Sequence, residues 1–409
     1  MSNAEPQPPA HTKAPHLAPI EIGLVIIGRI DRIDKRAITA TREQLAHELS
    51  NTFARFDWRI TLVQREEVPL SIRQEPSALL RDGSDLREAE GWDFALLFTA
   101  ADLTSRYKPY ALAATSSALD LAIISTNRID PHSFDAQTEE HQRIAALTQR
   151  LTTLCIRSLG HLNGLGATAD PHNIMSIPAS PAAISTMTEL DDAQRCAVDN
   201  NLQQIADPRL EETRASEFSP LQFYFHSARL NRHEIANAIV HARPWEFPFR
   251  LLRLTASAVS ATSLLMLTAE TWHLASLQPV TKLILLLILV LVATTVFVAK
   301  RQGLLIPKRH GLMSEQVVIT NVAAYLIVLI GLATTAAVLL IMNVLAGFLL
   351  YSPSLIAAWA ATDIHAVSMI NYTQVALLVT TLGLLIGSLG ATFEDQHHFR
   401  HVVFVDEEI

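Results

Sequence analysis

One apolar run, LILLLILVLVATTVFVA (283–299), constrains this 409-residue chain more than any other feature. It carries no charge, and at about 1.5 Å per helical residue it can cross a hydrocarbon core about 30 Å thick. Further apolar runs lie at about residues 252–274, 318–350 and 373–392, beside this one at about 280–299. We therefore predict an all-α transmembrane bundle of four helices over residues 251–395, with the lipid bilayer as its partner.

The other three runs are less regular. The first is rich in Ala, Ser and Thr and carries Glu270 near its end. The third would be about 50 Å long as a helix, so it must tilt, break or project from the membrane. The fourth contains GLLIG, in which Gly383 and Gly387 have the spacing that lets helices approach closely. This pair predicts helix packing, either within the bundle or between copies in a homo-oligomer.

Basic residues predict the topology of the bundle. Arg243, Arg250 and Arg253 precede the first run, and a second basic group separates runs two and three (Lys300, Arg301, Lys308 and Arg309). Lys and Arg concentrate on the cytoplasmic side of membrane proteins. We therefore expect a multi-pass protein of the cytoplasmic (inner) membrane with both termini in the cytoplasm. The net charge of −8 argues against a nucleic-acid partner.

The first half of the chain reads as a soluble α/β domain over residues 18–235. Short β-rich runs predict strands at 20–28, 58–63, 94–99 and 119–126. Amphipathic patterns predict helices at 41–56, 77–90, 138–164 and 190–206, the first capped by Thr41 and Gln44. Residues 1–17 are expected to be a disordered tail, 236–250 a linker and 396–409 a cytoplasmic tail.

The stretch RSLGHLNGLGA (157–167) has the texture of a zinc-protease helix that runs into a glycine turn. In the motif HExxHxxGxxH, three histidines bind zinc and the glutamate activates a water molecule. Laid on that motif, His161 takes the second ligand position and Gly164 the turn position. Met175, in HNIMSI (172–177), is placed like the methionine of a Met-turn.

On these residues the chain resembles the archaemetzincin-like branch of the metzincin clan. It is similar in particular to a bacterial membrane-anchored subgroup in which such a domain precedes several transmembrane helices. The resemblance covers residues 20–212 in element order, and GHLNGLG (160–166), which includes Gly166, carries most of it. It implies a metzincin-like α+β fold for the soluble domain.

The chain departs from this motif where the chemistry would be done. Arg157 stands at the first ligand position, Ser158 at the catalytic glutamate and Ala167 at the third ligand. Residues 167–175 also lack the cysteines of a second, structural zinc site. One imidazole cannot hold zinc, and a guanidinium adds positive charge where a dication should lie. We therefore expect no catalytic residues, no cofactor and no peptidase activity.

Two other interpretations of these residues stay open. His161, Asp170 and His172 would form a rebuilt metal site if the turn folds back, and zinc would then be bound. Alternatively, Arg157 occupies the emptied cavity and pairs with a carboxylate, for which Asp170 and Asp191 are the candidates. Cys155, on the same helix, reads as a small buried residue.

These features support three hypotheses. The first is a membrane-anchored pseudopeptidase that binds a protein or a peptide, with an extended peptide added as a strand beside FALLFT (94–99) and LDLAIIST (119–126). The second is a metal-dependent hydrolase with a site rebuilt around His161 and His172. The third is an integral membrane structural protein whose bundle is the functional part.

Overall fold

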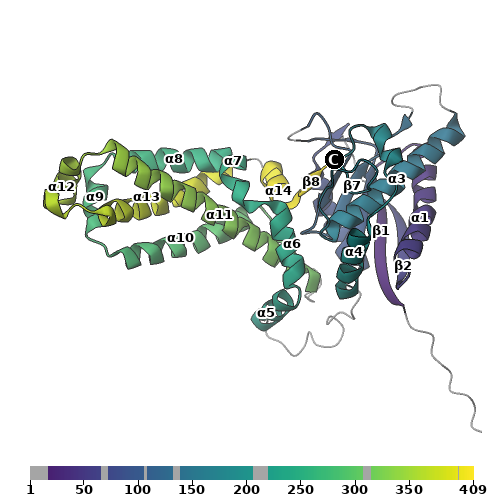
Figure 1. Ribbon diagram of the computed structural model, residues 1–409, viewed down its shortest axis with the longest axis horizontal. Helices are drawn as coiled ribbons and strands as arrows, with labels where there is room; N and C mark the ends of the chain where they lie inside the picture. The colour runs from purple at the N-terminus through teal and green to yellow at the C-terminus, as the bar shows by residue number, and fades with distance from the viewer. Residues whose placement is uncertain are drawn as a thin grey trace, which may run out of the picture.

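The computed structural model describes residues 17–65, 72–105, 108–131, 139–205, 220–306, 315–394 and 396–409. The chain forms an α/β domain followed by a helical bundle (Figure 1). The tail expected at 1–17 and the basic residues Lys308 and Arg309 lie outside the described residues, except for Leu17. The expected linker 236–250 is helical for most of its length, in α6 (Arg232–Ala242), a 3-10 turn and α7 (Phe247–Arg250).

The α/β domain is built on a six-stranded sheet in the order β2-β1-β4-β7-β6-β8. The strands are β1 (Ala18–Ile27), β2 (Phe56–Arg65), β4 (Phe94–Thr99), β6 (Ala113–Ser116), β7 (Leu121–Ser125) and β8 (Glu407–Glu408). Neighbouring strands from β2 to β7 are parallel, whereas β6 runs antiparallel to both β7 and β8. The last strand therefore comes from the C-terminus of the chain. A short separate pair joins β3 (Arg73–Gln74) to β5 (Asp102–Leu103).

Helices cover both faces of this sheet. Strand residues alternate between the faces, so Leu24 and Leu96 pack with α1 (Arg32–Thr52) and α3 (Glu140–Leu162) in one core cluster. Val25 and Leu97 face α2 (Pro76–Glu90) in a second cluster. A further helix, α4 (Asp192–Ile205), packs on the α1 and α3 side.

The observed elements differ from the sequence prediction in three places. Helix α1 begins before Thr41, because the side chain of Asp31 caps it by accepting from the Asp34 amide at 2.6 Å. Thr41 lies buried inside the helix and donates to the Ala37 carbonyl at 2.9 Å, so the predicted capping box is wrong. Strand β6 was not predicted. The segment expected as a tail forms α14 (Gln396–Phe404) and β8.

In the described part of the bundle, three helices are long and apolar enough to cross a membrane. They are α10 (Val280–Arg301), α11 (Glu315–Leu350) and α13 (Met369–Gly390). Large apolar side chains of α10 are exposed to the surroundings, as expected of a face toward lipid (Ile284, Leu285, Ile288, Leu289, Val292 and Phe297). Helix α11 is unbroken, and its N-terminal part packs against α5 (Pro220–Leu230), α6 and α7.

The first predicted span is not a straight helix. It consists of α8 (Leu252–Met266) and α9 (Ala269–Ser276), which meet at an angle of 85°, and it counts as a fourth span only if this bent pair is taken together. Side chains satisfy backbone groups freed at the break. The Thr268 hydroxyl donates to the Leu265 carbonyl at 2.8 Å, and the Trp272 indole donates to the Met266 carbonyl at 2.9 Å.

The far end of the bundle carries an aromatic cluster. Helices α9 and α12 (Pro353–Ala360) lie at the end that points away from the sheet (Figure 1). The ring of Trp272 lies 5.5 Å from that of Tyr351, 6.3 Å from Trp359 and 6.2 Å from Tyr372, measured between centroids. Aromatic rings gather where a membrane meets water.

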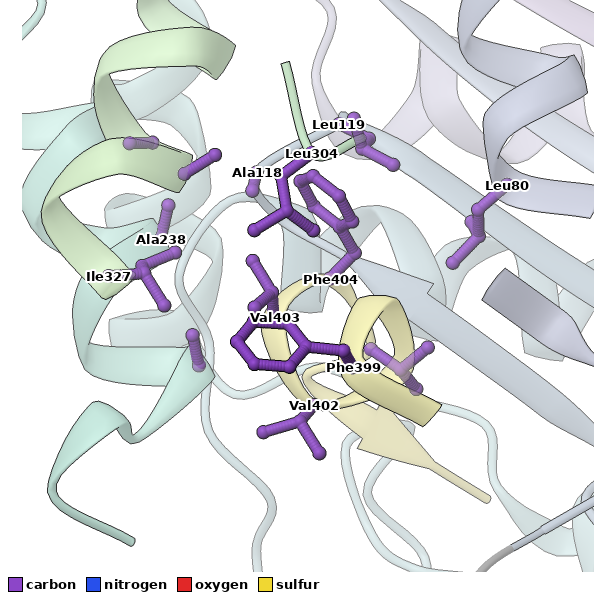
Figure 2. Close-up of a cluster of buried hydrophobic side chains, with 14 of the residues drawn as sticks. Leu80, Ala118, Leu119, Ala238, Leu304, Ile327, Phe399, Val402, Val403 and Phe404 are labelled. Carbon is purple, nitrogen blue, oxygen red and sulfur yellow. The ribbon is translucent and has the colours of Figure 1, made fainter. Parts of the chain in front are cut away.

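The bundle and the α/β domain share one apolar core at their junction. Leu80, Ala118 and Leu119 of the domain meet Leu304 and Ile327 of the bundle there, and α14 fills the space between them with Phe399, Val402, Val403 and Phe404 (Figure 2). Phe399 is fully buried and meets Phe247 of α7 edge to face, at 6.3 Å between ring centroids. The two parts are therefore joined by packing as well as by the chain.

Candidate functional site

The residues singled out by the sequence lie on the last turns of α3 and in the loop that follows. The helix ends at Leu162, and Gly164 then takes a positive φ of 85°, which an L side chain rarely adopts. A side chain there would also meet the Asn237 amide nitrogen at 3.1 Å. Gly166 is exposed and has open space around it, so the turn depends on Gly164 rather than on Gly166.

Met175, which the sequence comparison placed at a Met-turn position, packs against the last turns of α3 at Gly160. Its side chain is fully buried, and its sulfur would lie 2.8 Å from a Cβ added at Gly160. The Met175 amide donates to the Asn173 side chain at 2.8 Å, and its carbonyl accepts from the Thr168 amide at 3.2 Å. The loop therefore folds back under the helix and presses a thioether against it.

Arg157 is fully buried and is bound on both sides of its guanidinium. Nη1 and Nη2 donate to the two carboxylate oxygens of Glu407 at 2.8 and 2.9 Å, and Nε donates to the Ser176 carbonyl at 2.9 Å. The pairing with a carboxylate was predicted, but the partners named for it, Asp170 and Asp191, are wrong. Glu407 lies on β8, at the opposite end of the chain.

The two carboxylates expected near Arg157 have local roles instead. Asp191 caps α4 by accepting from the Gln194 amide at 2.7 Å, while the Gln194 side chain accepts from the Asp191 amide at 3.0 Å. Asp170 is exposed and accepts from the His172 amide at 3.0 Å. Short acidic side chains favour such bonds to their own backbone, so neither is available to a distant guanidinium.

His161 is 5% exposed and stays neutral in this setting. Burial lowers its pKa to about 4; Glu407 opposes the shift, whereas His241 and Arg157 add to it. Its Nδ1 lies 3.4 Å from a Glu407 oxygen without forming a hydrogen bond, and its ring meets that of His241 of α6 edge to face at 4.7 Å. The Nδ1 of His241 donates to the Asn237 carbonyl at 2.8 Å.

Burial and neighbouring charges also shift the pKa of Glu407. Burial raises its pKa, but the hydrogen bonds and charge of Arg157 outweigh burial, and the pKa of Glu407 lies below its ordinary value. The pair is therefore an arginine cation and a glutamate anion, with a neutral histidine beside it. Ser158, at the position of the catalytic glutamate, is fully buried and its hydroxyl has no hydrogen-bond partner.

The structure does not bring together the residues of the rebuilt metal site. His161 is buried, whereas His172 is exposed, with its Nδ1 3.4 Å from the Thr186 carbonyl. Ala167, at the third ligand position, is also exposed. Within the described ranges, no group of three or more His, Cys, Asp or Glu side chains is placed to hold a metal ion. Cys155 is buried, and burial raises the pKa of its thiol.

These residues do not fit the zinc ion that the resemblance implies. A catalytic zinc needs three protein ligands that converge on an open position. Here a guanidinium stands at the first ligand position, its carboxylate partner uses both oxygens on that guanidinium, and the third ligand position points away at the surface. The arrangement is a closed, charge-balanced core.

The strand beside this core is supplied by the chain itself. The sequence analysis expected an added peptide strand beside residues 94–99 and 119–126, but β4 and β7 are interior strands. On this side of the sheet, β6 would be the edge without β8, which pairs antiparallel with it. The Asp406 amide donates to the Thr115 carbonyl at 3.0 Å, and the Ile409 amide donates to that of Ala113 at 2.9 Å.

Sequence reasoning missed Glu407 and His241, which complete this core. Glu407 belongs to DEEI, which reads as a polar chain end, and His241 belongs to a segment read as a linker. The one available signal was Arg157 itself, since a buried arginine needs a carboxylate. That signal predicts a partner without saying where in the sequence it lies.

Comparisons with known proteins find structural similarity alone: no protein-family model and no curated protein matches the chain. Archaemetzincin from Methanopyrus kandleri is 18% identical with a TM-score of 0.36, covering 46% of this chain and 98% of its own. A zinc-dependent peptidase from Methanocorpusculum labreanum is 17% identical with a TM-score of 0.35. The match covers 43% of this chain and 99% of that peptidase. Archaemetzincin from Archaeoglobus fulgidus is 13% identical with a TM-score of 0.32. The match covers 44% of this chain and 99% of that archaemetzincin.

Proposed function

We propose that this chain is a membrane-anchored pseudopeptidase: a metzincin-like domain that holds an extended peptide at the edge of its sheet and does not cleave it. The observation that carries the proposal is the two-pronged ion pair between Arg157 and Glu407. It puts a permanent cation where the first zinc ligand would stand. In the present structure, the peptide held at the edge is the chain's own C-terminal strand.

The last four residues each have a defined place at this edge. Asp406 is buried and accepts from the Ser117 amide, and Glu407 binds Arg157. Glu408 lies 3.1 Å from the His401 ring nitrogen, and Ile409 is buried among the side chains of the α1 and α3 core. Backbone pairing supplies affinity in strand addition, and side-chain places supply specificity. An extended acidic segment with an apolar end therefore suits this edge.

The arrangement of charges supports an inner-membrane location with the domain in the cytoplasm. Arg253 at the start of α8 donates to the Phe393 carbonyl after α13, and Gln302 after α10 donates to the Ala391 carbonyl at 2.6 Å. The basic ends of the spans thus meet at the end of the bundle beside the α/β domain. By the preference of basic residues for the cytoplasm, both termini would lie there.

The absence of peptidase chemistry is tested on the full chain, purified in detergent without chelator and without a histidine tag. We expect zinc well below one equivalent by elemental mass spectrometry, and no cleavage of unstructured peptides. The Glu407→Gln variant, which opens one side of the core, should behave in the same way. About one equivalent of zinc, together with cleavage that His161→Ala abolishes, would show that the chain is an enzyme.

Peptide binding needs a second experiment, because the chain's own strand competes. The double variant Glu407→Ala, Ile409→Ser weakens that strand, and a fluorescent peptide ending in VDEEI is added in trans. We expect the variant to bind this peptide at least about tenfold more tightly than the unchanged chain does, since about 1.4 kcal/mol of competition corresponds to that factor. A peptide ending in VDQQI is the control. No binding of VDEEI to the variant would contradict the proposal.

A further inference from the structure

A small recess, partly open to solvent, lies where the domain meets the bundle. Its walls come from four separate parts of the chain: α2 of the domain, the turn between β6 and β7, the segment that follows α10, and α14. Leu119, Leu304 and Phe404 give it an apolar side. This recess is separate from the core around Arg157, although both use the C-terminal segment: Phe404 lines the recess, and Glu407 binds Arg157.

Two guanidinium groups line the opposite side of the recess. Arg400 of α14 is only 8% exposed, while Arg81 of α2 is exposed. Among the described residues, no carboxylate forms an ion pair with either one. Asp85 lines the same recess, which leaves two cations facing one anion. Burial, and then the charge of Arg81, lowers the pKa of Arg400.

The backbone around Arg400 is shaped to hold its side chain in place. Its Nε donates to the Gln302 carbonyl at 3.1 Å. Gly303 follows with a positive φ of 59°, and a Cβ there would lie 2.6 Å from Nη2 of Arg400. Only a glycine lets the chain turn this close to the guanidinium. No other hydrogen bond joins the guanidinium to a described residue, and Arg400 lines the recess.

The recess lies directly beyond the end of a membrane span. Helix α10 ends at Arg301, and Gly303, Leu304 and Ile306 of the following segment form part of the wall. An uncompensated buried cation is unfavourable unless an anion joins it. Arginine pairs particularly well with the oxygens of a phosphate group. The apolar walls beside an arginine–phosphate pair suit the acyl chains of a lipid whose phosphate lies level with the end of α10.

We propose that this recess binds a phosphate group, held by Arg81 and Arg400, as the headgroup of an anionic phospholipid or as a free phosphate. The ligand balances the charge at the junction and ties α2, α10 and α14 together. The site does not depend on whether the sheet edge binds peptides.

The test uses native mass spectrometry of the full chain released from detergent micelles, titrated with phosphatidylglycerol or with the zwitterionic phosphatidylcholine. We expect saturable binding of phosphatidylglycerol, about tenfold weaker after Arg81→Gln or Arg400→Gln, as loss of one charge-assisted contact implies. Arg301→Gln removes the same charge at the exposed end of α10, outside the recess, and should leave binding unchanged. Inorganic phosphate is then added as a competitor.

The outcomes separate the sources of the phosphate. Displacement of phosphatidylglycerol only by another anionic lipid identifies a lipid headgroup, and displacement by millimolar inorganic phosphate identifies a free phosphate. Equal binding of phosphatidylcholine, or an equal loss in Arg301→Gln, would overturn the proposal, because either result reflects a general attraction to the bilayer. Arg81 is exposed, so Arg81→Gln keeps the test valid even if Arg400→Gln does not fold.

Discussion

At the scale of single residues, Arg157 places a buried positive charge in the core at the end of α3. A fully buried guanidinium is unfavourable by itself, and here each of its three nitrogens donates a hydrogen bond, two to the Glu407 oxygens and one to the Ser176 carbonyl. The neighbouring imidazole of His161 stays neutral because the same burial penalises a second cation. The positive charge of Arg157 is therefore balanced by the negative charge of Glu407.

Loss of Arg157 should be costly. Arg157→Met leaves the Glu407 carboxylate partly buried without a counterion, and we expect the free energy of unfolding to fall by about 3–5 kcal/mol. The control is Arg55→Met, which removes an ion pair to Asp199 whose arginine is 70% exposed and should cost under about 1 kcal/mol. Urea unfolding followed by circular dichroism measures both. Equal losses in the two variants would show that the buried pair has no special weight.

Asp406 should make docking of the C-terminal strand depend on pH. Burial raises its pKa from 3.8 to about 7, the Ser117 hydrogen bonds oppose this, and Glu407 and Asp120 add to it. A carboxyl whose folded-state pKa is raised stabilises the fold below its unfolded pKa, and this stability is lost as pH rises through about 7. Asp406→Asn imitates the protonated form. We expect it to raise Tm strongly at pH 8 and progressively less as the pH falls toward about 4, where the unfolded carboxyl is protonated as well. Equal effects at both ends of this range would contradict this.

Among elements, those with a local pattern were predicted and those without were not. The amphipathic pattern of 138–164 and the β-rich runs appear as α3 and as β1, β2, β4 and β7. Strand β6 is four residues long and β8 two, so neither has a period to detect. Strand β6 exists because it pairs with β7, and β8 exists because it pairs with β6. The 85° break between α8 and α9 likewise depends on side chains that cap it.

The glycines of GLLIG should matter through contact between α13 and α8. A Cβ at Gly383 would lie 2.3 Å from Thr262 Cγ2, and one at Gly387 would lie 2.9 Å from the Ala258 Cβ. Gly383→Leu therefore overpacks this helix pair, and we expect a loss of about 1–3 kcal/mol. Gly166→Ala, at an exposed glycine with open space, should change stability by less than about 0.5 kcal/mol. Thermal unfolding in detergent measures both, and an unchanged Tm for Gly383→Leu would exclude close packing there.

Across the whole molecule, the C-terminal segment joins the helical bundle to the sheet. It leaves α13, packs through α14 at the shared core and ends as β8 at the sheet edge (Figure 1). Changes at one end of this segment should therefore reach the other. Phe399→Ala removes a fully buried ring at the junction, whereas Phe393→Ala removes one that is 75% exposed.

We expect Phe399→Ala to lower stability by about 3–5 kcal/mol and to speed amide hydrogen exchange in β6 and β8 as well as in α14. Phe393→Ala should leave exchange in the sheet unchanged. Hydrogen exchange followed by mass spectrometry on the full chain makes the comparison. Faster exchange confined to α14 would mean that the sheet edge is held independently of the junction.

The sequence by itself determined the division into an α/β half and an apolar half, the strongest spans, and the helix and glycine turn around His161 and Gly164. Burial patterns and glycine conformations are local, so residues a few positions apart are enough to predict them. Tertiary structure alone decided that Glu407 pairs with Arg157, that β8 completes the sheet, and that Arg81 and Arg400 share a recess. Charges and strand edges have no periodicity along the chain. Their partners are selected by distance in the folded molecule, which brings residue 157 to residue 407.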